Sequence, residues 1–202
     1  MVTVKRRDST TWLVYRSRMA RGRIPPGGIV DSAIVLIDQE GFEALSLSAI
    51  AETLGVRPSA LYSHVGNLDR LRDRLAVTAT NHLTSAVGAA AMGVAGANAL
   101  DAIGHAYRGF ARGHPGQYSA ILRPAAADNV DLVVANQALH TVFARVYLGV
   151  GLGPDQADLI AGNTRSAIHG FVSLEHASGT TAGHDSKYAH LLGGLHGQLE
   201  TS

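Results

Sequence analysis

Residues 46–64, SLSAIAETLGVRPSALYSH, read as two short helices joined by a tight turn. Leucine, isoleucine and alanine recur at helical spacing in the first half, so the first helix has one apolar face. Gly55 then allows a left-handed backbone that ends this helix, and Pro58 suits the first position of the next helix. The pattern predicts a helix-turn-helix, in which the second helix enters the major groove of DNA. The alternative is an αα-corner with no role in DNA binding.

Helical patterns flank this segment on both sides. A helix over residues 29–40 is predicted to end at Gly41, and Asn67 is placed to cap a longer helix that continues to about His82. The remainder shows helical stripes and no strand pattern; the expected helices cover 100–110, 118–122, 132–150, 155–177 and 188–199. The predicted fold is therefore all-α.

Composition and charge narrow the class of protein. Hydrophobic residues make up 46% and charged residues 16% of the 202 residues, enough apolar material for a buried core. Cysteine is absent, and no signal peptide or convincing membrane span is visible, which favours a cytoplasmic protein. Residues 1–26 carry seven basic side chains, Arg21 and Arg23 among them, against one acidic side chain. This segment is either a cationic arm that follows DNA phosphates or a solubilising tail.

Four motifs in a fixed order resemble the DNA-binding head of the tetracycline-repressor (TetR) family of transcriptional regulators. They are A-x-x-L-I-D-x-x-G-F over 33–42, L-S-L-S-A-I-A-x-x-L-G-V over 45–56, P-S-A-L-Y-x-H over 58–64 and N-x-D-x-L over 67–71. R-S-A-I-H-G-F-V-S-L-E over 165–175 resembles the H-G-containing helix of one branch of TetR-like C-terminal domains.

The resemblance implies a homodimer with a basic flexible arm over 1–26, a three-helix helix-turn-helix domain over 27–75, and a larger helical effector-binding and dimerisation domain over 76–202. It implies a pseudo-palindromic operator in double-stranded DNA and a small-molecule effector that releases repression of a nearby gene. The matching positions expected to contact DNA are Ser46, Arg57, Pro58, Ser59, Ala60, Tyr62 and His64. Arg57 is the candidate for reading guanine, with a phosphate contact as the alternative.

Helical phase selects candidate residues in the C-terminal part of the chain. An effector pocket is expected where apolar walls meet a few polar groups, among Tyr107, Phe110, Tyr118, Leu122, Asn136, His140, Phe143 and His169. Asn136 and His140 form the sharpest polar pair, although hydrogen-bonded core residues would give the same pattern. The last two helices are expected to form the dimer interface through Gly162, Ser166 and Gly170 and through the leucines Leu191, Leu195 and Leu199.

Two other functions are alternatives to an effector-controlled regulator. Ten histidines raise the possibility of an enzyme, but they are scattered, and no metal-ligand spacing, nucleophile elbow or phosphate-binding glycine loop accompanies them. No catalytic residue, metal or cofactor is therefore predicted. A DNA-binding activator or architectural factor without an effector is the other alternative, and the large uncharged body argues against it.

Overall fold

The computed structural model describes residues 24, 27–124 and 128–199, and within these ranges all regular secondary structure is helical. The elements in chain order are α2 (Gly28–Glu40), η1 (Phe42–Ala44), α3 (Leu47–Leu54), α4 (Pro58–Val65), α5 (Leu68–Ala90), α6 (Gly96–Gly113), α7 (Pro115–Leu122), α8 (Val130–Gly149), α9 (Pro154–Ser178), α10 (His184–His196) and η2 (Gly197–Leu199). The expected all-α fold is confirmed.

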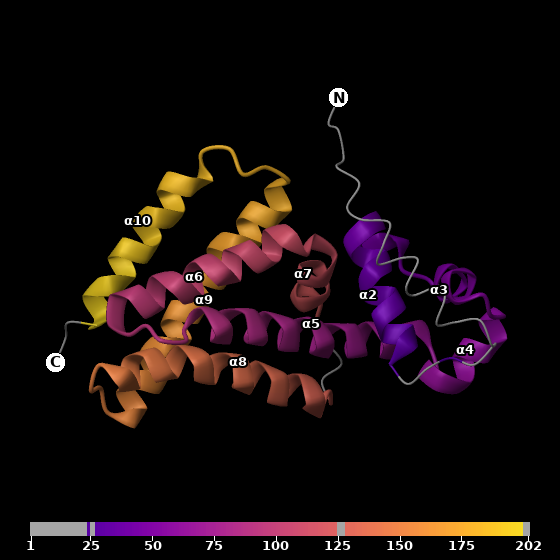
Figure 1. Cartoon of the computed structure of the whole chain (residues 1–202), viewed down its shortest axis with the longest axis horizontal. Coiled ribbons are helices and arrows are strands. Elements are labelled where there is room, and N and C mark those ends of the chain that lie inside the picture. Colours follow the sequence, from indigo (N-terminus) through magenta and orange to yellow (C-terminus); the bar gives the residue numbers. More distant parts are fainter. Residues whose placement is uncertain (1–23, 25–26, 125–127, 200–202) are drawn as a thin grey trace.

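Helices α2, α3 and α4 and the start of α5 form a small unit, here called the head, at one end of the molecule (Figure 1). Its core is made of side chains that the sequence pattern placed on apolar faces. Ile37, Ile50, Leu61, Leu71 and Leu75 have no solvent exposure. Burying aliphatic side chains of this size contributes about 1.5–3 kcal/mol each.

Local signals set the ends of the head helices, those at Gly55, Pro58 and Asn67 as predicted. The Ser46 hydroxyl accepts a hydrogen bond from the Ala49 amide at 3.1 Å and so caps α3. Gly55 ends α3 in the left-handed conformation, with φ of 65°. Pro58 opens α4, and the Asn67 side chain accepts from the Arg70 amide at 2.8 Å at the start of α5. The side chains of Ser46 and Asn67 each satisfy a backbone amide that has no partner within its own helix.

Helix α5 is shared by two separate hydrophobic cores. Leu71, Leu75 and Ala79 belong to the head core, whereas Leu83 and Val87 belong to the core of the remaining helices, here called the body. Figure 1 shows α5 running from the head through the middle of the body. The boundary expected between residues 75 and 76 falls inside this continuous helix.

The end of the chain differs from the expectation. The last α-helix stops at His196, and Leu199 lies in the short turn η2. Tyr188, Leu192 and Leu195 are buried in the body core of the same chain. Gly104 allows this packing, because a Cβ at that position would lie 2.6 Å from Leu192 Cδ2. Within the described ranges, no helix is long and apolar enough to cross a membrane.

Candidate nucleic-acid interface

The start of α4 is a polar tip on an apolar base. Arg57, the N-cap residue, has an extended backbone and an exposed side chain, and Pro58, Ser59 and Ala60 after it are exposed as well. Leu61 is buried beneath them and anchors the helix to the head core. The guanidinium of Arg57 is therefore presented to solvent at the end of a short, well-anchored helix, which is the geometry needed to reach a base edge or a phosphate.

The predicted backbone-contacting residues surround this tip. Tyr62 is 56% exposed although it is a large aromatic residue, and His64 is exposed in the last turn of α4. Arg74 of α5 donates to the His64 carbonyl oxygen at 3.2 Å and ties the end of α4 to α5. Arg21 and Arg23 lie outside the described residues.

The structure brings four of the predicted effector-pocket residues together in the body. Tyr107, Tyr118 and Phe143 are buried; the rings of Tyr107 and Tyr118 lie edge-on to the His169 ring, and the Phe143 ring contacts that of Tyr107. The Tyr107 and Tyr118 hydroxyls lie 2.8 and 3.2 Å from His169 Nδ1, and Tyr118 also lies 3.2 Å from Ser173 Oγ. Burial lowers the pKa of His169 and raises the pKa values of Tyr107 and Tyr118, so all three groups are neutral near pH 7.

These polar groups form one connected cluster. Ser173 Oγ donates to the His169 carbonyl oxygen at 2.7 Å, so it is free to accept from Tyr118. The Tyr107 and Tyr118 hydroxyls also interact with each other as well as with His169. The imidazole of His169 is thus the polar centre of an otherwise aromatic region of the body.

The other predicted pocket residues lie elsewhere. Asn136 and His140 are half-buried at the contact between α8 and α9, and both already have partners: Arg165 donates to Asn136 Oδ1 at 2.7 Å, and His140 Nε2 lies 2.8 Å from Asp158. Phe110 is buried with its ring 5.1 Å from that of His114, and Leu122 is half-buried against the body core. The polar pair singled out in the sequence thus links two helices.

The predicted dimer residues fall into two groups. On α9, Ser166 and Gly170 are exposed and Gly162 is half-buried, so a stripe of small residues faces outward. Leu159 and Leu174, exposed by 65% and 75%, extend this stripe at helical spacing at either end. The sequence analysis missed both leucines, although their spacing from Ser166 and Gly170 was a usable signal.

The α10 group packs largely within its own chain, and its expected role in the dimer interface stays a prediction. Leu195 is buried in the chain's own core, and Leu191 and Leu199 are partly buried against it. The reason is that α10 folds back over α6, where Gly104 leaves room for Leu192. Apolar periodicity identified the buried face of this helix, but the surface that covers it belongs to the same chain.

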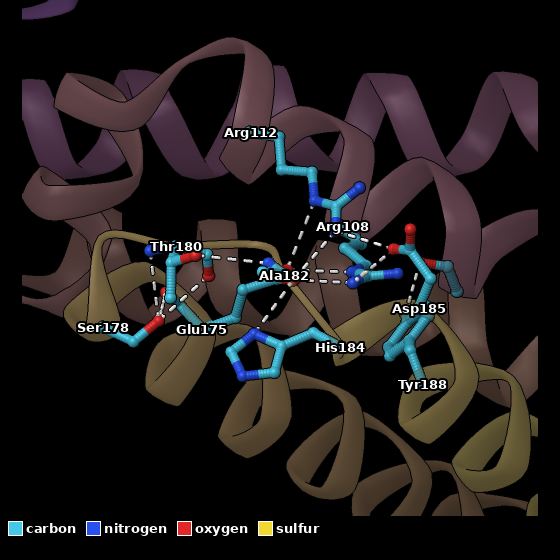
Figure 2. Close-up of polar contacts among 10 residues, drawn as sticks. Arg108, Arg112, Glu175, Ser178, Thr180, Ala182, His184, Asp185 and Tyr188 are labelled. Atoms are coloured by element: carbon cyan, nitrogen blue, oxygen red, sulfur yellow. Dashed lines mark hydrogen bonds and ion pairs between the residues drawn. The ribbon is translucent and has the colours of Figure 1, made fainter. Parts of the chain in front are cut away.

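The sequence analysis also missed an ion network that joins α6, α9 and α10, in which Arg108 and Glu175 are buried (Figure 2). Arg108 donates two hydrogen bonds to Glu175, at 2.6 and 2.8 Å, and Arg112 donates two, at 2.8 and 3.4 Å. Both arginines also lie 2.9 Å from Asp185, and the Arg108 guanidinium stacks 4.6 Å above the Tyr188 ring. The two arginines lower the pKa of Glu175 to about 2.

Two family models match this chain, one over the head and one over the body. Residues 29–73 match the family model described as bacterial regulatory proteins of the tetR family, and residues 100–193 match the model of the Tetracyclin repressor-like C-terminal domain. The HTH-type transcriptional regulator Rv0681 of Mycobacterium tuberculosis is 33% identical over 148 residues, which cover 73% of this chain and 68% of the relative.

Solved structures share the fold over most of both chains. A TetR variant from Acinetobacter baumannii AYE in complex with minocycline is 19% identical, with a TM-score of 0.64 over 88% of this chain and 95% of the other. BioQ with its natural double-stranded DNA operator is also 19% identical, with a TM-score of 0.63 over 87% of this chain and 99% of the other. With a head that presents Arg57 at the tip of a helix-turn-helix, and matches over both parts, the chain belongs to the TetR family of helix-turn-helix transcriptional regulators.

Proposed function

We propose that this regulator represses a nearby gene by binding a pseudo-palindromic operator as a homodimer, and that a small molecule bound in the body releases it. The observation that carries the proposal is the exposed, arginine-led start of α4 on a well-anchored head. BioQ, which shares the fold, is known in complex with its operator, and the family as a whole binds operator DNA as dimers. A repressor of this kind works in the cytoplasm, where the DNA is.

Arg57 is the residue proposed to read sequence, through two parallel hydrogen bonds to guanine O6 and N7. The duplex for the test is the tightest binder selected from a randomised library. Replacing Arg57→Ala should weaken binding to it by about 1–3 kcal/mol and relax preference at one base pair in each half-site. The matched control is Arg145→Ala, an exposed arginine of the body. An equal loss on all sequences makes Arg57 a phosphate contact, and no loss refutes its role in DNA binding.

The proposed effector site is the body region around Tyr107, Tyr118, Phe143 and His169. Its support is chemical: buried aromatic rings lie next to a neutral imidazole, which is a polar group that can hydrogen-bond to a ligand. This combination fits a largely apolar effector that carries one polar group. A thermal-shift screen of small apolar compounds tests the site. A stabilising compound should lose its effect in His169→Phe, and an unchanged shift in that variant would place the site elsewhere.

The proposed dimer surface is the outward face of α9, from Leu159 through Ser166 and Gly170 to Leu174. An added side chain at Gly170 meets no atom of this chain within 4 Å, so Gly170→Arg fits the folded monomer. We expect it to shift the wild-type dimer to monomer in sedimentation velocity. Gly109→Arg, at a similarly open helical glycine on α6, is the control and should leave the dimer intact. A dimer that persists in Gly170→Arg refutes this surface.

A further inference from the structure

The head and the body touch through the first turn of α7. At Gly116 the two backbones are so close that an added Cβ would lie 1.9 Å from the Ile37 carbonyl oxygen of α2. Only glycine fits there. Further along the same short helix, Ala120 is buried in the head core, while Tyr118 belongs to the body core. Helix α7 is thus packed on one side against α2 and on the other against the body.

The carboxylate of Asp38 stabilises this contact between α2 and α7. Asp38 of α2 accepts hydrogen bonds from the Gln117 backbone amide at 3.0 Å and from the Gln117 side-chain amide at 2.7 Å, and lies 2.9 Å from His114 Nδ1. The Gln117 amide oxygen lies in turn 2.7 Å from His82 Nδ1 of α5. Gln117 is 3% exposed. A single polar cluster, which we call the Asp38 clasp, therefore ties together α2, α5 and α7.

Asp38 is unfavourable within its own helix and becomes favourable only through its contact with α7. Asp38 lies near the C-terminal end of α2, where the helix dipole disfavours a negative charge and no basic residue of the last turn offsets it. Helix α7 lacks a cap of its own, because the side chain of its N-cap residue His114 makes no capping hydrogen bond. Asp38 supplies that cap from another helix and gains the positive end of the α7 dipole. A locally unfavourable residue thus becomes favourable through a tertiary contact.

We propose that Asp38 is a positioning residue for operator recognition, which acts by fixing the angle between the head and the body. This rests on the proposed dimeric operator binding. From His82 to Leu68, α5 is a lever of about 21 Å at 1.5 Å per residue. A tilt of about 10° at the clasp moves the recognition helix by about one base-pair rise, ~3.4 Å. In a dimer, the clasp therefore sets which spacing of half-sites both heads can reach at once.

The test measures spacing preference in the full-length protein. Its DNA probes are duplexes that carry two copies of a half-site selected with the wild type, with the centre-to-centre spacing varied in one-base-pair steps, and one duplex with a single half-site. Wild type should prefer one spacing over its neighbours. Asp38→Ala should reduce that preference by about fivefold or more, within the usual range for coupled sites, and leave single-half-site affinity unchanged. Glu40→Ala removes the same charge from the exposed end of α2 and should keep the wild-type preference.

The second variant, Asp38→Asn, distinguishes loss of the contact from a general folding defect. Asp38→Asn keeps the shape and one acceptor oxygen but loses the charge, so it should flatten the preference less than Asp38→Ala does. Faster hydrogen exchange at the Gln117 amide should accompany the effect in both variants. Wild-type spacing preference in folded Asp38→Ala and Asp38→Asn overturns the inference. Failure of wild type itself to bind any of the duplexes overturns the proposed function instead.

Discussion

Glu175→Gln is the sharpest test of how the body is held together. Glu175 is 5% exposed and Arg108 is 8% exposed, so the substitution leaves a buried guanidinium without its main counter-charge. The wild-type pKa falls from 4.5 to about 2 on folding, which corresponds to about 3 kcal/mol of stability at neutral pH. Removing one partner of a buried ion pair costs a similar 3–5 kcal/mol in other proteins. For a chain of this length, the expected fall in Tm is about 6–12 °C.

The assay is thermal unfolding followed by circular dichroism at a fixed protein concentration, because the proposed dimerisation would make Tm depend on concentration. The matched control is Asp185→Asn, which removes one charge from the same network at a side chain that is 78% exposed, and it should lower Tm far less.

The pH dependence of the stability difference between wild type and Glu175→Gln tests the role assigned to the ion network. A carboxyl whose pKa is depressed by folding stabilises the fold above its unfolded pKa, and this stabilisation is lost as the pH falls toward the folded pKa. The gap between wild type and Glu175→Gln should therefore hold from pH 7 down to about pH 5 and shrink to less than half near pH 3. Equal effects of Glu175→Gln and Asp185→Asn, or a gap that is the same at pH 3 and pH 7, would refute the assigned role of the network.

Two smaller predictions concern single positions. Ser46→Ala should lower the free energy of unfolding by about 1 kcal/mol through loss of the α3 cap, and Ser48→Ala, at an exposed serine of the same helix, should have little effect in denaturant titration. Gly104→Ala should cost about 1–3 kcal/mol because the methyl group displaces Leu192, whereas Gly109→Ala meets open space and should not destabilise. Stability of Gly104→Ala at or above that of Gly109→Ala would contradict the close packing of α10 on α6.

The head was predictable from sequence because its signals are local. The cap at Ser46, the left-handed Gly55 and the proline that opens α4 each follow from residues within one or two turns. Leu61 is buried as helical phase predicts, whereas Ala60, which the same pattern places on the inward face, is exposed. The order of the body helices was predictable for the same reason, with shifts of a few residues at their ends, such as the earlier end of α10 at His196.

The tertiary partners of each helix could not be predicted from sequence, because periodicity shows which face of a helix is buried but not what buries it. The leucines of α10 had an apolar stripe compatible with a partner chain or with their own body, and only the fold-back over Gly104 decides for the body. Asn136 and His140 were recognised as polar residues in an apolar stripe, yet their partners Arg165 and Asp158 lie on a different helix. Nothing in the local sequence specifies that pairing.

Two residues that break a local rule mark long-range contacts, although the sequence analysis singled out neither of them. Asp38 carries a negative charge at the end of a helix where the dipole disfavours it, and Glu175 is a buried carboxylate three residues before the end of α9. Each is stabilised from outside its own helix, Asp38 by the uncapped start of α7 and Glu175 by two arginines of α6. Since such residues lower the stability of their own segment, their cost is offset only by the contact between elements. The two exceptions therefore mark the two junctions of the molecule, one between head and body and one between α10 and the rest of the body.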